Sequence, residues 1–310
     1  MPGSSFPAPR LRYPVHTLEG KELLPAGSQV TAGLLSTIAD QGRSRNEPSG
    51  GLLQHGTVLP DLVGFLCEGP YKVVFEDGKR FYGMMQMMER VTLPLPLLRS
   101  LDHFRDHDPF TYRHILCVFA LSTLLAQELM GTSGAAIQGA TSGPMHDIGK
   151  LCVPLSIMKK RSALTRDERD WLRHHTAAGY VLLAYYFGDA GAITARVALE
   201  HHERRDGSGY PLGIFQKERM VEIVAVCDVY DALISPRPYR PTCYDNRTAL
   251  EEMTLLVEQG RLAGDIVQAL VAYNRQDKPD YRACKLSLDK RGHAPEGNVY
   301  GVVADEADPG

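Results

Sequence analysis

The chain has 310 residues, of which 44% are hydrophobic and 23% charged, and its formal net charge is -3. This composition is close to the average for soluble globular proteins, which excludes global disorder and allows a hydrophobic core. Because the charge is slightly negative, the chain lacks the general basic field that would hold duplex nucleic acid, and a nucleotide ligand must be held locally. The length fits a small domain joined to a larger one.

The cysteines and the first residues favour a cytoplasmic protein. The six cysteines are scattered without a CxxC pair, which is typical of reduced thiols rather than of a disulfide framework. The first residues lack the pattern of a signal peptide, and no apolar run reaches about 18 residues. We therefore expect a cytoplasmic location and no membrane association.

Residues 1–100 are expected to form a small accessory or regulatory domain of mixed α/β structure. Apolar residues at helical spacing predict a short helix over residues 28–39. Residues 42–56, rich in Gly, Ser, Arg and Asn, are interpreted as a surface loop. Strand-like runs on both sides of Asp77-Gly78 predict a hairpin, because both turn positions tolerate positive φ.

Residues 101–285 are expected to form an all-helical domain, and residues 286–310 a loose polar tail. Apolar residues all round predict a buried helix over 112–130. Thr165 and Glu168 form a capping box that opens a helix ending near Phe187. Further helices are predicted at 190–202, 219–234, 246–259 and 264–275. The fold class is thus α+β, with a C-terminal helical bundle and a small α/β N-terminal domain.

Seven residues of the second part form a candidate metal-ligand set: His114, His146, Asp147, His175, His201, His202 and Asp228. Mixtures of imidazole and carboxylate suit Fe, Mn, Ni, Co or Zn, and the absence of cysteine from these motifs argues against a structural zinc. Single members have structural alternatives, such as a core position for His114 or a solvated helix end for His201. Asp228 lies in an apolar helical run and requires a cation, either a metal ion or an arginine.

Four longer motifs contain most of this set: His146-Asp147-Ile148-Gly149-Lys150, His201-His202-Glu203, Asp206-Gly207-Ser208-Gly209-Tyr210-Pro211 and Asp228-Val229-Tyr230-Asp231. Over about residues 106–275 the chain resembles the HD-GYP subfamily of the HD superfamily of phosphohydrolases. Members of this family are cyclic di-GMP phosphodiesterases of bacterial second-messenger signalling. The resemblance implies an HD-type helical bundle and hydrolysis of cyclic di-GMP to linear pGpG, with a second step to GMP left open.

The resemblance also implies a binuclear centre. One metal ion would be held by His114, His146, Asp147 and Asp228, and the other by His175, His201 and His202, with Asp147 as the bridge. Two cations about 3.5–4 Å apart can share a hydroxide and neutralise charge on a phosphoryl oxygen. Iron is favoured, with Mn, Ni, Co or Zn as alternatives. Some family members have a glutamate and a third metal one turn before the first histidine, where this chain has Phe110.

Asp147 and Lys150 are the candidate catalytic residues. Lys150 follows His146 by one helical turn and is expected to hold a phosphate oxygen or assist the leaving group, with a surface position as the alternative. Tyr210, Arg237 and Arg240 match family positions for substrate binding, since arginine suits phosphate and an aromatic face suits guanine, and Lys150 is expected to bind substrate with them. Glu203 either orients a ligand imidazole or is a solvated helix-end acid.

The segment before His146 departs from the family pattern. Pro144 disfavours a helical Gly143 and predicts a new helix that starts near Pro144 after a loop. This leaves other substrates open, either another cyclic dinucleotide or a nucleoside phosphate, together with a sensor that binds without turnover. For the N-terminal segment, control of access, homodimerisation and binding of a regulatory protein all remain open.

Overall fold

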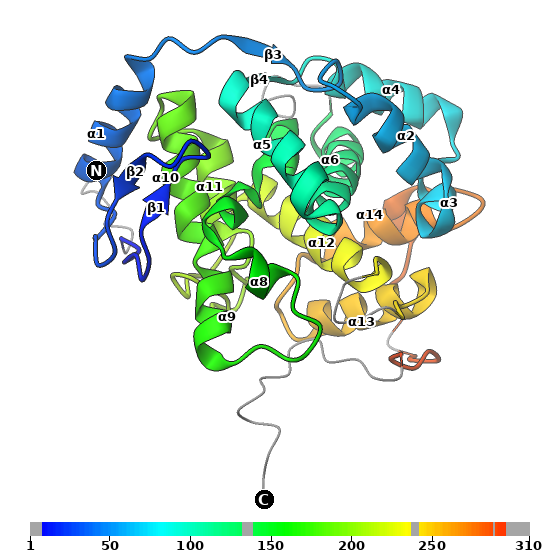
Figure 1. Ribbon diagram of the computed structural model, residues 1–310. Helices are drawn as coiled ribbons and strands as arrows, with labels where there is room; N and C mark the ends of the chain where they lie inside the picture. The colour runs from blue at the N-terminus through cyan, green and yellow to red at the C-terminus, as the bar shows by residue number, and fades with distance from the viewer. Residues whose placement is uncertain (1–7, 132–138, 237–241, 288, 296–310) are drawn as a thin grey trace, which may run out of the picture.

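The computed structural model describes residues 8–131, 139–236, 242–287 and 289–295. Its ribbon is largely helical (Figure 1), and the strands form two antiparallel pairs, β1 with β2 and β3 with β4. All four strands precede residue 95, and the elements that follow are helices. The fold class expected from the sequence, α+β with a helical C-terminal part, is therefore confirmed.

The elements up to residue 94 are β1 (Val15–His16), β2 (Glu22–Leu24), α1 (Ala32–Arg43), β3 (Ser49–Gly51), α2 (Val58–Cys67), α3 (Lys72–Phe75), α4 (Gly78–Met88) and β4 (Thr92–Pro94). They are followed by α5 (Leu95–His107), α6 (Pro109–Met130), α8 (Leu155–Met158), α9 (Arg166–Arg173), α10 (His175–Phe187), α11 (Ile193–Glu200), α12 (Arg219–Ile234), α13 (Asn246–Glu258) and α14 (Gly264–Asn274). The 3₁₀ helices are η1 (Gly69–Tyr71), η2 (Gly143–Met145), η3 (Ile148–Cys152) and η4 (Tyr281–Ala283).

The predicted hairpin at residues 71–84 is wrong, because both of its arms are helical. Asp77 is the N-cap of α4, and its carboxylate accepts hydrogen bonds from the backbone N–H groups of Lys79 and Arg80. An aspartate before a glycine satisfies a helix start as well as a tight turn. The methionines of α4 then decide between the two, because Met84, Met87 and Met88 face the core at helical spacing.

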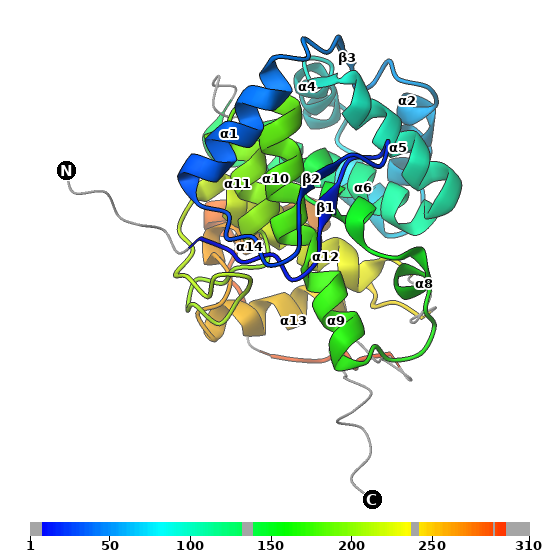
Figure 2. The ribbon, with the colours of Figure 1, turned by 60° about the vertical axis from the view of Figure 1, so that its left-hand side comes forward.

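The first helix begins and ends later than predicted. Thr31 is the N-cap of α1, because its side chain accepts a hydrogen bond from the backbone N–H of Leu34. The helix begins at Ala32 and ends at Arg43. The predicted loop over residues 42–56 consequently begins inside α1, and it also contains β3. Figure 2 shows α1 lying along α10.

The segment before residue 100 lies on two sides of the helical part. α1 and the β1–β2 hairpin contact α10, whereas α2 and α4 contact α6 on the other side of the molecule in Figure 1. One cluster of buried apolar side chains runs through all these elements, from Leu11 to Tyr273. The boundary near residue 100 stays a prediction, and this position lies inside α5.

The long helix α6 is the centre of the bundle and confirms the buried helix predicted over 112–130. It contacts α2, α4, α5, α12 and α14, which surround it. Among the described residues it is the one helix that is long and apolar enough to cross a membrane, and 83% of its apolar window is buried inside the protein. A core helix of this kind satisfies the same length and composition test.

The C-terminal helices largely confirm the sequence predictions. α12 has the predicted bounds, α13 and α14 end one residue early, and Thr165 and Glu168 form the predicted capping box. The helix expected to run on to Phe187 is divided at His174 into α9 and α10. The part of the tail that is described lies against α13, because Glu251 accepts hydrogen bonds from the backbone of Arg291 and Gly292.

The segment around His146 contains two 3₁₀ helices, and the first of them, η2, begins at Gly143, next to the helix start predicted near Pro144. η2 and η3 flank His146 and Asp147, and η3 packs against α10. A Cβ atom at Gly149 would lie 1.8 Å from the carbonyl oxygen of His175. Glycine is thus required for the close approach that brings Asp147 next to α10.

Candidate metal centre

The structure brings all seven predicted ligands to one place inside the bundle. His114 is on α6 and Asp228 on α12, while the remaining five lie at helix ends or between short helices. All are buried except His202, whose side chain is 21% exposed. Residues more than a hundred positions apart thus meet in one polar site within an apolar core.

The first cluster consists of His114, His146 and Asp228, whose ligand atoms all lie within 4.8 Å of one another. The Nε2 atoms of His114 and His146 are 3.2 Å apart, and Nε2 of His114 is 3.2 Å from Oδ1 of Asp228. Imidazole nitrogens and a carboxylate oxygen at this spacing could hold a first-row transition-metal ion.

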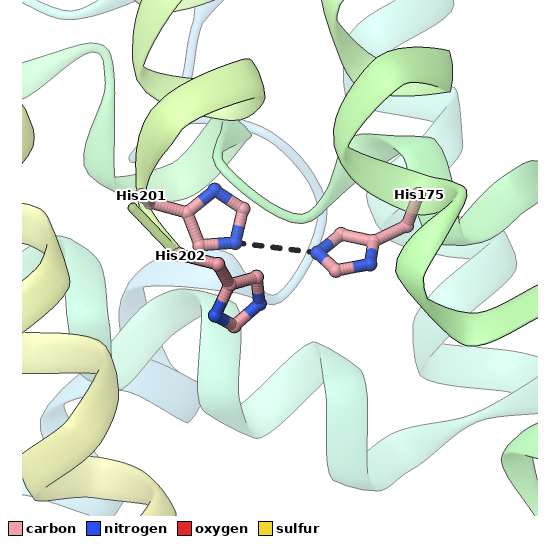
Figure 3. Close-up of side chains that lie close together, drawn as sticks. All are labelled: His175, His201 and His202. Atoms are coloured by element: carbon pink, nitrogen blue, oxygen red, sulfur yellow. Dashed lines mark hydrogen bonds between the residues drawn. The ribbon is translucent and has the colours of Figure 1, made fainter. Parts of the chain in front are cut away.

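The second cluster consists of His175, His201 and His202, again with their ligand atoms within 4.8 Å of one another. Figure 3 shows His175 facing the two adjacent histidines across a gap, and the dashed line joins Nε2 of His175 to Nε2 of His201 at 3.2 Å. His175 is the first residue of α10, and the other two follow the last turn of α11.

Asp147 lies between the two clusters. Its Oδ2 atom is 3.3 Å from Nε2 of His114 and 3.4 Å from Nε2 of His146, whereas Oδ1 is 3.4 Å from Nε2 of His175. His146, Asp147 and His201 also form a third group of possible ligands. One carboxylate can therefore reach both clusters, which is the geometry of a bridging ligand.

Backbone carbonyls determine which nitrogen of three of these histidines faces the centre. The Nδ1 atoms of His146 and His175 donate to the carbonyl oxygens of Gly143 and Leu172, at 2.7 and 2.5 Å. Nδ1 of His201 donates in the same way to Ala198, at 3.0 Å. Because a carbonyl only accepts, Nδ1 carries the proton and Nε2 turns a lone pair inward.

The inward lone pairs face one another and the carboxylates. Such atoms repel at 3.2 Å unless a cation or a shared proton lies between them. Burial lowers the pKa of His175 to about 4 and that of His201 to about 3, so both imidazoles are neutral near pH 7. A metal ion in each cluster would remove this repulsion, so the donor set fits two metal ions.

The two aspartates are held in the ionised form. Burial alone would raise the pKa of Asp147, but the Lys150 ammonium and the neighbouring histidines hold it well below its usual range. Burial opposes ionisation of Asp228 in the same way, and the neighbouring histidines, His114 first and then His202, hold its pKa well below its usual range. Buried carboxylates that stay ionised suit cation binding.

Lys150 reaches the site as predicted, but on a 3₁₀ turn. Its Nζ atom donates to Oδ2 of Asp147 at 2.5 Å, and its side chain is 11% exposed. The surface alternative for this lysine is therefore wrong. Its ammonium lies beside the carboxylate that faces both clusters, where it can contact a bound anion.

Asp231 and Tyr71 were not recognised as site residues from the sequence. Nδ1 of His114 donates to Oδ2 of Asp231 at 2.5 Å, and the hydroxyl of the buried Tyr71 donates to Oδ1 of the same aspartate. Ser235 adds a further hydrogen bond to this aspartate at 3.1 Å. The signal for Asp231 was its spacing of three residues from Asp228, which places both acids on one helix face.

Tyr210 contacts the second cluster directly. Its ring stacks on the imidazole of His202, with centroids 4.6 Å apart and planes at 21°. The guanidinium of Arg173 also lies over this ring, 4.7 Å from its centroid. Arg237 and Arg240, the other predicted substrate-binding residues, lie outside the described residues.

Both predicted alternatives for Glu203 are wrong. Its carboxylate is buried and accepts hydrogen bonds from the backbone N–H groups of Leu212, Gly213 and Ile214, at 2.6, 3.2 and 3.1 Å. Burial raises the pKa of Glu203, and these three donors oppose that rise. The residue therefore holds the glycine-rich loop that carries Tyr210.

Comparison with known proteins identifies the family. The family model described as "HD domain" matches residues 97–265, which is more than half of the chain and contains all seven predicted ligands. The chain therefore belongs to the HD domain family, in its HD-GYP branch.

Three relatives illustrate the similarity. The chain is 34% identical over 193 residues to a cyclic di-GMP phosphodiesterase of Thermotoga maritima, covering 61% of this chain and 50% of that one. It is 39% identical over 145 residues to the cyclic di-GMP phosphodiesterase PA4108 of Pseudomonas aeruginosa, covering 46% and 35%. It is 33% identical over 171 residues to the 3'3'-cGAMP-specific phosphodiesterase 1 of Vibrio cholerae, covering 54% and 38%. The chain spans half or less of the length of these relatives.

A solved structure gives a weaker match. Bd1817, described as a HDG"Y"P protein from Bdellovibrio bacteriovorus, aligns with a TM-score of 0.44 at 11% identity, over 86% of this chain and 95% of that one. A score at this level carries no argument for either fold or function.

Proposed function

We propose that the protein is a binuclear, metal-dependent phosphodiesterase that hydrolyses cyclic di-GMP to linear pGpG. The observation that carries the proposal is Asp147, whose two carboxylate oxygens face two separate histidine clusters. Relatives that match the same part of the chain are named cyclic di-GMP phosphodiesterases. A cytoplasmic location, a homodimer or regulatory partner at the N-terminal segment, and a further step to GMP stay predictions.

The metal ions would be divided between the clusters. His114, His146, Asp147 and Asp228 would hold one ion, and His175, His201 and His202 the other, with Asp147 as the shared ligand. Iron is the proposed metal, and Mn, Ni, Co and Zn are alternatives that suit the same histidine and carboxylate ligands. When bound, two such ions lower the pKa of a water and stabilise charge on a phosphoryl oxygen.

The chain's own residues would bind and orient the substrate. Lys150 can hold a non-bridging oxygen of the scissile phosphate, or donate a proton to the oxygen that leaves. Arg237 and Arg240 are proposed to contact phosphate, and Tyr210 a guanine base. Hydrolysis adds the hydroxyl of one water to phosphorus, breaks the bond from phosphorus to a 3′ oxygen, and leaves the proton on that oxygen.

The test is metal analysis coupled to a hydrolysis assay on protein purified without oxygen. We expect about two metal ions per chain and pGpG as the first product from cyclic di-GMP. Asp147→Ala is expected to lose metal and turnover together. The matched control is His103→Ala, which removes a histidine of α5 outside the ligand set. Metal-loaded protein that hydrolyses no cyclic dinucleotide would falsify the proposal.

A second candidate substrate is 3'3'-cGAMP, because some relatives are named for it. Both substrates have the same phosphodiester ring and differ in one base. A substrate panel with product identification separates them, and the larger kcat/KM identifies the substrate. Tight binding of a cyclic dinucleotide by metal-loaded protein without turnover would instead support a sensor.

A further inference from the structure

A polar pocket lies beside the metal centre, because Tyr210 both lines it and stacks on His202 of the second cluster. It has a volume of about 240 Å³ and is lined by Pro9, Arg10 and Arg12, by the end of α9 and the start of α10, and by the Tyr210-Pro211 pair. Whole ligands usually occupy roughly 300–1,000 Å³. This pocket therefore fits one part of a ligand whose remainder is bound elsewhere.

The pocket is rich in arginine. Arg10, Arg12 and Arg173 line it, and Asp170 is the acidic residue among its lining side chains. Arg12 is paired with Asp170. Arg10 and Arg173 are exposed and thus accessible to an incoming anion. Planar guanidinium groups bind phosphate oxygens in pairs and also stack on bases.

A buried side chain in the same wall also points to a ligand. His174 is 5% exposed and lines the pocket, and its Nε2 atom makes no hydrogen bond to any residue within the described ranges. A buried polar atom without a partner costs free energy, which a polar group of a ligand would recover. This observation is independent of the arginines.

The wall formed by the N-terminal segment is fixed in place. The ring of Tyr13 stacks on Trp171 of α9, with centroids 3.4 Å apart and planes at 13°. The same ring contacts His174 edge-on at 5.5 Å. Together with the Arg12–Asp170 ion pair, these contacts hold the N-terminal wall of the pocket, which includes Arg10, against α9.

Tyr210 connects the pocket to the metal centre. One side chain of the second cluster, His202, stacks on its ring, and Arg173 lies over the same ring. A guanine base that stacks on Tyr210 must therefore share the ring with Arg173 or displace it. Tyr210 therefore contacts a side chain of the second cluster and also lines the pocket.

We propose that this pocket is a subsite for the second nucleotide of the bound cyclic dinucleotide, with Arg10 and Arg173 contacting its phosphate and base. The proposal rests on the proposed function, and it assigns part of the substrate site to the N-terminal segment. The segment would thereby act in substrate recognition, in addition to packing on α9.

The test compares a large and a small substrate. Arg10→Gln and Arg173→Gln are assayed on cyclic di-GMP and on bis(p-nitrophenyl) phosphate, a diester too small to span both sites. We expect KM for cyclic di-GMP to rise about tenfold, at least five times more than KM for the small diester. Metal content, measured in each variant, is expected to match that of the unsubstituted protein.

Two further variants sharpen the outcome. Arg173→Lys keeps the charge and loses the planar group, so it is expected to recover part of the affinity. Arg282→Gln, at an arginine of η4 with a 73% exposed side chain, is the control and is expected to change neither KM. If the unsubstituted protein is active and both glutamine variants raise KM for the two substrates by the same factor, the proposed subsite is wrong. If the unsubstituted protein hydrolyses no cyclic dinucleotide, the proposed function fails first.

Discussion

The hydroxyl of Tyr71 donates a hydrogen bond to the carboxylate of Asp231, which in turn accepts one from Nδ1 of His114. Tyr71 belongs to η1 in the first hundred residues, whereas Asp231 is on α12 and His114 on α6. The tyrosine thus positions a carboxylate that orients a candidate metal ligand. Groups of this kind fix the tautomer of a ligand histidine and increase its basicity.

Tyr71→Phe is expected to weaken metal binding by about tenfold or more, because Asp231 loses a hydrogen bond and holds His114 less firmly. The measurement is the metal dissociation constant from competition with a chelator. Tyr230→Phe is the matched control, since its buried hydroxyl donates to Asn274. Equal metal affinities in the two variants would show that Tyr71 serves stability alone.

His202→Ala is expected to reduce the metal content from about two ions per chain to about one, because the ion proposed at the first cluster keeps its four ligands, Asp147 included. His202 is also the partly exposed member of the second cluster, so its replacement disturbs the core least. Metal analysis after gel filtration gives the ratio directly. A variant that still holds two ions would remove His202 from the ligand set.

The metal-free protein is expected to lose stability as the pH falls from about 6.5 towards 4. Burial lowers the folded-state pKa of His174 and His175 to about 4 and that of His201 to about 3. The unfolded chain therefore binds more protons across this window, and each histidine lowers the free energy of unfolding by at most about 1.4 kcal/mol per pH unit.

Urea unfolding at a series of pH values tests this expectation. His175→Asn is expected to reduce the dependence of the free energy of unfolding on pH, because one of the contributing imidazoles is removed. A free energy of unfolding that stays constant between pH 6.5 and 4 would contradict the burial of these histidines in the neutral form.

Gly149→Ala is expected to destabilise the fold by about 1–3 kcal/mol and to lower the metal content. The added Cβ would lie 1.8 Å from the carbonyl oxygen of His175, so η3 must move away from α10 and take Asp147 with it. Gly64→Ala on α2 is the control, since no atom lies within 4 Å of its added Cβ. Thermal unfolding and metal analysis of both variants separate the two effects.

Local sequence signals identified much of the fold. α12 was predicted at its observed bounds because an apolar run of helical length lies between a charged start and a Ser-Pro end. The capping box of Thr165 and Glu168 is likewise a local pattern. The Asp77-Gly78 signal failed because it fits two local structures, and packing of the methionines of α4 decides between them.

Most of the seven candidate ligands were found because they lie in long motifs. Tyr71 was missed because it meets Asp231 across 160 residues, and no local pattern records that contact. The sequence also did not predict that the N-terminal segment packs on two sides of the bundle, because this too depends on contacts between residues far apart in the chain. Arg173 escaped notice because a lysine or arginine at a helix end is ordinary on a surface, and its position over Tyr210 depends on a loop from elsewhere in the chain.

Three consecutive residues, His201, His202 and Glu203, connect two parts of the site. The imidazoles face the candidate metal centre, and the carboxylate binds the backbone of the loop after Tyr210. The loop is therefore anchored one peptide bond away from a ligand. Grafting a loop from another family member would have to preserve three amide donors for Glu203, or the exchange would disturb the metal site as well as the choice of substrate.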